Sequence, residues 1–362
     1  MTLSPLDELP IHQAPISMRH VATSDRNFYD RSYFNLHDGT GDVFGVFGMG
    51  QYPNLGVQDA FLLVADHEAH RVLRASRALG PDRADTTCGP LRIEVVEPLR
   101  VIRVVAEPHG DAPSCDLTWT GAIPAHEEPG QRMRLNERTT FDSMRFAQTG
   151  RWEGWITVDG ERREVTPDRW WGSRDRSWGI RPVGEPEPPG IGAAHPLEGF
   201  FWIYSPMQFE DFSILCIRQD HPDGRPVLRQ AVRVWPDGRT DDLGPGSVEL
   251  RFRDGTRELT GATWTLRETD GSDLVVEAEV LLPVWLGKGT GYGFDDDWRH
   301  GMWQGELEVQ EVRYDLTDPA VQASMFGIQE SVSRFTCGDH VGHGLLEWLF
   351  LGRHDPSGWT GW

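Results

Sequence analysis

A series of five Asp-Gly dipeptides between residues 159 and 271 constrains the fold of this chain more than any other feature of its sequence. They stand at positions 159–160, 223–224, 237–238, 254–255 and 270–271. Asp-Gly suits the positive φ angles of tight hairpin turns. The flanking segments alternate between apolar and polar residues, for instance over 248–253 and 274–280, as half-buried strands do. The series therefore predicts a meander of antiparallel strands.

Strands explain most of the remaining pattern, and helix signals are few. Asp318 followed by Pro319 predicts one short helix, with the aspartate as N-cap and the proline in the first turn. The apolar phase shifts by one residue between 303–309 and 312–316, which indicates a β-bulge near Glu311. Rougher alternation predicts further strands over 43–49, 58–66, 91–106, 115–120 and 146–165.

Many short strands at regular spacing favour a β-barrel or sandwich. The 362 residues exceed what one compact core usually fills. The segment 184–196 is rich in proline and glycine, which argues against a core strand there. We therefore expect an all-β protein with few short helices and two domains, over residues 1–185 and 186–362.

The charge balance excludes several classes of partner. Lys+Arg number 35 against 56 Asp+Glu, and the net charge of −21 repels nucleic-acid phosphates and anionic membrane surfaces. No apolar run reaches the roughly 20 residues of a transmembrane helix, and the N-terminal segment has no apolar signal region. We expect a cytoplasmic protein with reduced thiols, without nucleic-acid partners and without stable insertion into a membrane.

Metal and cofactor motifs are also lacking in the sequence. The four cysteines form no CxxC pair, and the residues His340 and His343 have no further ligand beside them. Lys288, the only lysine, stands in a glycine-rich segment without Walker spacing, and neither GxSxG nor GxGxxG occurs. The sequence therefore predicts neither a bound metal nor a cofactor.

The most distinctive segment is 169–182, where three tryptophans, an aspartate and several arginines stand close together. Alternate residues of an extended strand face the same side. One face of a strand here carries Trp171, Ser173, Asp175 and Ser177. The other face carries Trp170, Arg174, Arg176 and Trp178.

The run Gly172-Ser-Arg-Asp-Arg-Ser-Trp-Gly179 resembles the Gly-x-x-Asp-His-Asn-Trp/Tyr-Gly signature of the hydroxyneurosporene synthase (carotenoid hydratase) family. That family belongs to an AttH-like superfamily of paired lipocalin-like (calycin-like) barrels, which includes enzymes that fold polyenes into decalins. The resemblance implies that Asp175 protonates an alkene, and that Trp171 and Trp178 stabilise the carbocation until water captures it. The chain departs from the signature at Arg176 and Ser177, which replace the histidine and the asparagine.

Two interpretations of Asp175 follow from its surroundings. A carboxyl group in a dry aromatic cavity has a raised pKa and holds a proton at neutral pH. The neighbouring Arg174 and Arg176 instead favour the carboxylate, and an Asp175–Arg pair would be structural.

Other candidates lie outside this segment. His37 stands beside acidic and aromatic residues, either as a base at a barrel mouth or as a hydrogen-bonded turn residue. His300 and Trp303 follow the glycine-rich loop and are candidates to close over a ligand. Trp202 and Tyr204 alternate in the segment that opens the second half, where they line a cavity or fill a core.

Three functions compete on this sequence. The first is a cofactor-independent enzyme, a hydratase or dehydratase (hydro-lyase), an isomerase or a cyclase, acting on a hydrophobic terpenoid- or polyketide-like small molecule. It predicts that Asp175 faces a closed pocket in which it meets apolar and aromatic groups and no arginine. The second is a carrier or sensor of a lipophilic ligand, which predicts a pocket without a titratable group and an Asp175 that is solvent-facing or salt-bridged. The third, glycan binding, predicts an exposed strip of tryptophans.

Overall fold

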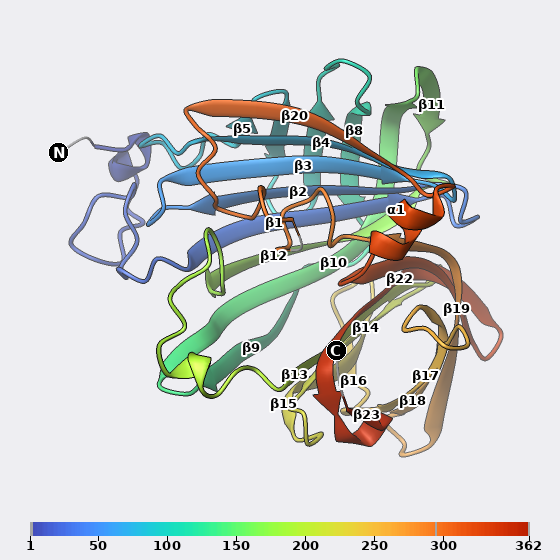
Figure 1. Ribbon diagram of the computed structural model, residues 1–362. Coiled ribbons are helices and arrows are strands. Elements are labelled where there is room, and N and C mark those ends of the chain that lie inside the picture. Colours follow the sequence, from blue (N-terminus) through green and yellow to red (C-terminus); the bar gives the residue numbers. More distant parts are fainter. Residues whose placement is uncertain (1–2, 294, 361–362) are drawn as a thin grey trace.

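The computed structural model describes residues 3–293 and 295–360, which form two antiparallel sheets that face one another (Figure 1). The strands before residue 185 are β1 (Phe28–His37), β2 (Phe44–Tyr52), β3 (Val57–Ala65), β4 (Ala69–Ala78), β5 (Thr87–Cys88), β6 (Leu91–Glu97), β7 (Val101–Ala106), β8 (Ser114–Gly121), β9 (His126–Leu135), β10 (Arg138–Val158), β11 (Glu161–Val165) and β12 (Trp171–Ile180). Those after it are β13 (Gly199–Gln208), β14 (Ser213–Asp220), β15 (Pro226–Val234), β16 (Thr240–Asp242), β17 (Ser247–Phe252), β18 (Leu259–Arg267), β19 (Asp273–Trp285), β20 (Leu307–Asp315), β21 (Gln329–Cys337), β22 (His340–His354) and β23 (Trp359–Thr360). The helical elements are η1 (Pro5–Glu8), η2 (Gly190–Ala193), α1 (Pro319–Ser324) and η3 (Asp355–Ser357).

Both sheets curl, and the all-β prediction with two lipocalin-like domains is confirmed. The first sheet has 13 strands in the order β20-β4-β3-β2-β1-β12-β10-β8-β7-β6-β5, with β9 and β11 paired to β10. Its far end folds back, so that β5 and β6 contact β3. The second sheet has 10 strands in the order β16-β15-β14-β13-β22-β21-β19-β18-β17, with β23 paired to β22.

The five Asp-Gly dipeptides between residues 159 and 271 all lie in turns between consecutive strands, as predicted. The five glycines have φ angles between 72° and 88°, in the left-handed region that glycine tolerates best. Asp159 also has a positive φ of 50°, as the two-residue loop between β10 and β11 requires.

The helical elements are short, and the helix predicted after Asp318 is confirmed as α1. The Asp318 side chain accepts a hydrogen bond from the backbone N–H of Ala320 at 2.8 Å. The strand predicted over 91–106 is two strands, because the chain turns at Pro98 and Leu99, where Leu99 has a φ of 62°. Within residues 3–293 and 295–360, no helix has the length and apolar character needed to cross a membrane.

The β-bulge predicted near Glu311 is wrong. Strand β20 pairs with β4 in one unbroken register from Leu307–Arg77 to Asp315–Ala69. The apolar phase shifts because this strand serves two cores: Val309 packs against the core of the first sheet, and Val312 packs between the sheets. A regular strand that buries apolar residues on both faces therefore shows the same one-residue shift in its sequence as a strand with a β-bulge.

Strand β20 also crosses the expected boundary between the halves. It follows residue 186 in the sequence but forms an edge of the first sheet (Figure 1). The loop before it, described over residues 286–293 and 295–306, therefore leads from the second sheet to the first. The division into 1–185 and 186–362 remains a prediction.

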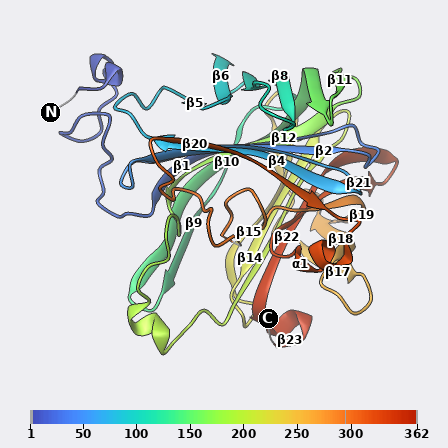
Figure 2. The ribbon, with the colours of Figure 1, turned by 45° about the horizontal axis from the view of Figure 1, so that its top comes forward.

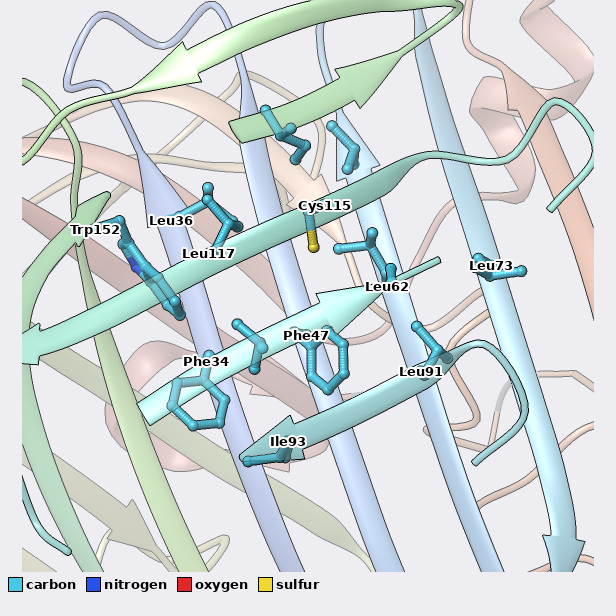
Figure 3. Packing of buried hydrophobic residues seen from close by; sticks show 14 of the residues in the cluster. Phe34, Leu36, Phe47, Leu62, Leu73, Leu91, Ile93, Cys115, Leu117 and Trp152 are labelled. Atoms are coloured by element: carbon cyan, nitrogen blue, oxygen red, sulfur yellow. The ribbon is translucent and has the colours of Figure 1, made fainter. Parts of the chain in front are cut away.

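Among the described residues, three large buried apolar clusters and a small one around Tyr52 hold the molecule together. One fills the curl of the first sheet, where Trp119 and Trp152 pack edge to face at 5.2 Å (Figure 3 shows Trp152 beside Phe34). A second fills the curl of the second sheet around Trp264. The third lies between the sheets and joins residues such as Phe61 and Leu345. Many of the 15 tryptophans are core residues, which leaves few for a ligand cavity.

Candidate active site

A cavity of about 700 Å³ opens where the two sheets meet, a volume typical of small-molecule sites. Strands β9 and β10 reach from the first sheet to β15 and β13 of the second (Figures 1 and 2). The loop 286–306 and the connector after β12 complete the wall. Its apolar and aromatic lining includes Tyr29, Phe141, Phe200, Trp202, Tyr292 and Leu349.

Strand pairing places Asp175 on the wall of this cavity. Asp175 of β12 lies between Tyr33 of β1 and Ala147 of β10. Two residues further, Ser177 lies between Arg31 and Arg145. Because side chains alternate along strands, these residues share one face of the first sheet, and all except Ala147 line the cavity.

The arginines that flank Asp175 in the sequence are on the opposite face. Arg174 donates from Nε to Oε1 of Gln148 at 2.9 Å. Arg176 pairs with Asp30 at 2.7 Å. Neither arginine lines the cavity, so the alternation expected for this strand is observed.

The carboxyl group of Asp175 is half-buried, with no hydrogen bond or ion pair to any residue that the structure describes. Burial raises its pKa to about 6, against the opposing influence of the nearby Arg145 guanidinium. The negative charges of Glu128 and Glu347 add to the rise. A group in this state exchanges a proton near neutral pH.

Arg145 is occupied by partners other than Asp175. Its Nε donates to Oε2 of Glu128, and its guanidinium lies 4.2 Å from the ring centre of Tyr204 and 5.3 Å from that of Trp202. Trp202 lines the cavity, whereas Tyr204 is buried behind Arg145 and does not. The cation is thereby kept near Asp175 without neutralising it.

A carboxyl pair that was not predicted from the sequence lies at the cavity: Glu347 lines the wall, and its neighbour Glu330 does not. Glu330 of β21 pairs in register with Glu347 of β22, and Glu330 is fully buried. Tyr33 donates its hydroxyl hydrogen to Glu330 at 2.5 Å, and the indole N–H of Trp202 donates to Glu347. Burial and the charge of Glu347 raise the pKa of Glu330 well above its usual range, and burial raises that of Glu347.

A signal for this pair existed in the sequence. Glu347 stands alone in the apolar run 345–351, where a plain core strand has no reason to carry a carboxyl group. Glu330 gave no comparable signal, because it stands among polar residues such as Gln329 and Ser331.

His300 lines the end of the cavity, as expected from its place after the glycine-rich loop. Its Nε2 lies 2.9 Å from the carbonyl oxygen of Thr290 and therefore carries the hydrogen. Nδ1 is then an acceptor for Nη2 of Arg181 at 3.1 Å. Burial holds the pKa of His300 well below its usual range, so the ring is neutral. Gly291 permits this packing, because a Cβ there would lie 2.6 Å from Cδ2 of His300.

The structure does not bring Trp171 and His37 to the cavity. These residues face each other across β12 and β1. Trp171 packs against His343 at 5.4 Å, and Arg151 stacks on it at 4.3 Å. His37 is fully buried, its ring nitrogens have no partner in the described part of the chain, and burial lowers its pKa to about 3. Trp171 precedes Asp175 by four residues, which along a strand is about 13 Å. At that distance Trp171 lies beyond the end of the cavity.

Trp178 and Trp303 lie on the surface, outside the cavity lining. Their side chains are 39% and 48% exposed. Trp178 stands on the face of β12 that turns away from Asp175. Trp303 belongs to an irregular segment after Gly301, for which strand alternation predicts no direction. Of the eight residues expected at the site, Asp175, Trp202 and His300 line the cavity.

The solved structures that share this fold include the following three. An AttH protein from Nitrosomonas europaea is 14% identical, with 94% of this chain and 98% of that chain covered and a TM-score of 0.54. Kievitone hydratase from Nectria haematococca is 14% identical, with 97% and 96% covered and a TM-score of 0.52. CghA with Sch210972 is 11% identical, with 91% and 89% covered and a TM-score of 0.52. Identities this low show the fold alone, and they confirm the resemblance to the AttH-like superfamily at that level.

Comparisons of sequence are less informative about activity. No curated protein matches the chain. A family profile matches residues 3–360, nearly the whole sequence, and the protein therefore belongs to that family, which is described as a family of unknown function (DUF8625).

Proposed function

We propose that this protein is a cofactor-independent enzyme that uses Asp175 as a general acid on a hydrophobic small molecule. The reaction is a hydration or dehydration, an isomerisation or a cyclisation of a terpenoid- or polyketide-like compound. One observation carries the proposal: the Asp175 carboxyl group has no hydrogen-bond or ion-pair partner in the described residues, and it lines a cavity between the sheets whose wall combines aromatic and apolar side chains with arginines.

The state of this carboxyl group suits acid catalysis. With a pKa of about 6, roughly a tenth of the molecules hold the proton at pH 7. A bound apolar substrate displaces water from the cavity, which disfavours the carboxylate further and increases the protonated fraction.

In this proposal the proton of Asp175 passes to an alkene carbon and leaves a carbocation beside the carboxylate. The ring of Trp202 and the tyrosine rings of the wall stabilise the positive charge through their π faces. In a hydration, water adds to the cation and returns one proton to Asp175, so that the enzyme ends in its starting state. In an isomerisation or cyclisation, the carboxylate takes a proton from the cation itself.

The experiment that tests the proposal begins with ligand capture. The protein is purified from its own host, and native mass spectrometry identifies the retained small molecule. That compound is then incubated in deuterated water with the wild type, with Asp175→Asn, and with Asp296→Asn as an exposed control.

We expect deuterium at a substrate carbon with the wild type and the control, and none with Asp175→Asn. Unchanged conversion by a folded Asp175→Asn protein would rule out the acid role. A compound that is retained but never converted by the wild type would favour the alternative function, a carrier of lipophilic ligands.

A further inference from the structure

Five arginines line the cavity, and they differ in their partners. Three of them form ion pairs: Arg31 with Asp59, Arg138 with Glu187, and Arg145 with Glu128. Arg181 and Arg299 have no carboxylate partner in the part of the chain that the structure describes. Acidic side chains outnumber basic ones by 56 to 35, so a shortage of carboxylates does not explain this.

Arg181 is held in place without being neutralised. Its guanidinium stacks on the ring of Tyr29 at 4.5 Å, and Nη2 donates to Nδ1 of His300 at 3.1 Å. His300 accepts this bond as a neutral ring, because its Nε2–H is directed to the Thr290 carbonyl. A guanidinium has five N–H donors, and His300 is the only acceptor among the described residues. The remaining donors are available to a ligand in the cavity.

The Arg181 charge acts on the carboxyl groups of Asp175 and Asp59 from a distance, but none of the described carboxylates pairs with it directly. A half-buried cation without a paired carboxylate is costly to desolvate, and a ligand that supplies the negative charge at the guanidinium lowers this cost. The planar guanidinium donates two parallel hydrogen bonds to a carboxylate, and it binds an enolate oxygen in a similar way. Arg299, next to His300 in the sequence, adds a second positive charge to the wall of the same cavity. The remaining lining offers apolar groups such as Phe200 and Leu349 for a hydrophobic skeleton.

We infer that Arg181, positioned by His300 and Tyr29, binds an acidic oxygen group of the ligand, so that the substrate class is an organic acid with a long apolar skeleton. The acidic group lies at Arg181, and the skeleton extends past Asp175 along the aromatic wall. The placement of the reacting skeleton at Asp175 rests on the proposed function, whereas the binding of the acidic group by Arg181 does not.

The test uses two fluorescent probes that differ only in charge, 11-(dansylamino)undecanoic acid and its methyl ester. Each is titrated at neutral pH into the wild type, Arg181→Gln and Arg239→Gln. Arg239 is the matched control, because it also stacks on an aromatic ring, Trp235 at 4.3 Å, but does not line the cavity. We expect the wild type and the control to bind the acid about tenfold more tightly than the ester. Arg181→Gln should lose this preference and keep its affinity for the ester.

Equal affinities of the wild type for acid and ester would overturn the inference. So would an undiminished preference in Arg181→Gln, or a preference that only Arg299→Gln removes. If Arg181→Gln does not fold, Arg181→Lys keeps the charge without the planar fork and should weaken the acid several-fold relative to the ester. An unchanged ratio in that variant would equally contradict the assignment.

The two proposals fail separately. Asp175→Asn should abolish conversion and keep the preference for the acid probe. Unchanged conversion by Asp175→Asn, with the preference for the acid probe intact, would rule out only the acid role of Asp175. Lost conversion by Asp175→Asn, with equal affinities of the wild type for acid and ester, would rule out only the Arg181 subsite.

Discussion

The hydroxyl group of Tyr33 in β1 donates a 2.5 Å hydrogen bond to Oε2 of Glu330 in β21, and so links the two sheets. Both side chains are buried, at 5% and 0% exposure. The net contribution of a buried hydrogen bond to stability is modest. Removing one partner costs more free energy, because the other partner is left buried without a hydrogen bond.

Tyr33→Phe should therefore destabilise the protein by about 1–3 kcal/mol, since it leaves a buried carboxyl oxygen without its donor. Urea unfolding of the variant and the wild type measures the change. Tyr314→Phe is the control, because that hydroxyl has no hydrogen bond within the described residues. Equal effects of the two substitutions would show that the bond between the sheets contributes nothing.

The pKa of Asp175 predicts a pH-dependent stability. The pKa is about 6 in the folded protein against a usual value of 3.8, so the folded state binds the proton more tightly than the unfolded chain. This stabilisation is fully present below about pH 4 and is lost as the pH rises through about 6.

Asp175→Asn should consequently be more stable than the wild type at pH 8, by on the order of 1 kcal/mol because cavity water screens the half-buried group. The difference should shrink or vanish at pH 4. Urea unfolding at both values measures it, and a gain that does not vary with pH would contradict the assigned pKa.

The ion pair between Glu128 and Arg145 helps to keep the pKa of Asp175 raised. Glu128→Gln removes a negative charge and frees the guanidinium to interact with Asp175, so the pKa of Asp175 should fall toward about 4. Carbon-13 NMR of labelled aspartate carboxyl groups follows this titration. Glu153→Gln, an exposed change on the same strand β10, should leave it unaltered. A constant pKa in Glu128→Gln would mean that Arg145 does not act on Asp175.

The position of the aromatic wall can be checked by comparing two tryptophans. Trp202→Leu should weaken the binding of the dansyl methyl ester about fivefold, because the indole ring lines the cavity. Trp171→Leu should leave this affinity within twofold, since Trp171 packs against His343 instead. Weaker binding in Trp171→Leu at unchanged fold would place the ligand further along β12 than the cavity extends.

Local sequence patterns determined the strand architecture. The Asp-Gly turns were predictable because their backbone angles depend on two adjacent residues, and the helix after Asp318 because its N-cap and proline are local signals. The faces of β12 were predictable too, since side-chain alternation is a property of a single strand. Alternation therefore predicted correctly that Asp175 lies on the face of β12 opposite to Arg174 and Arg176.

Only the tertiary structure decided where the cavity begins and ends. Trp171 and Asp175 share a face of one strand, yet the second sheet and the loop 286–306 enclose space at Asp175 alone. The contact of Tyr33 with Glu330 joins residues 297 positions apart. Periodicity along one strand specifies the side to which a residue points, but the partner on that side depends on how two curled sheets pack together.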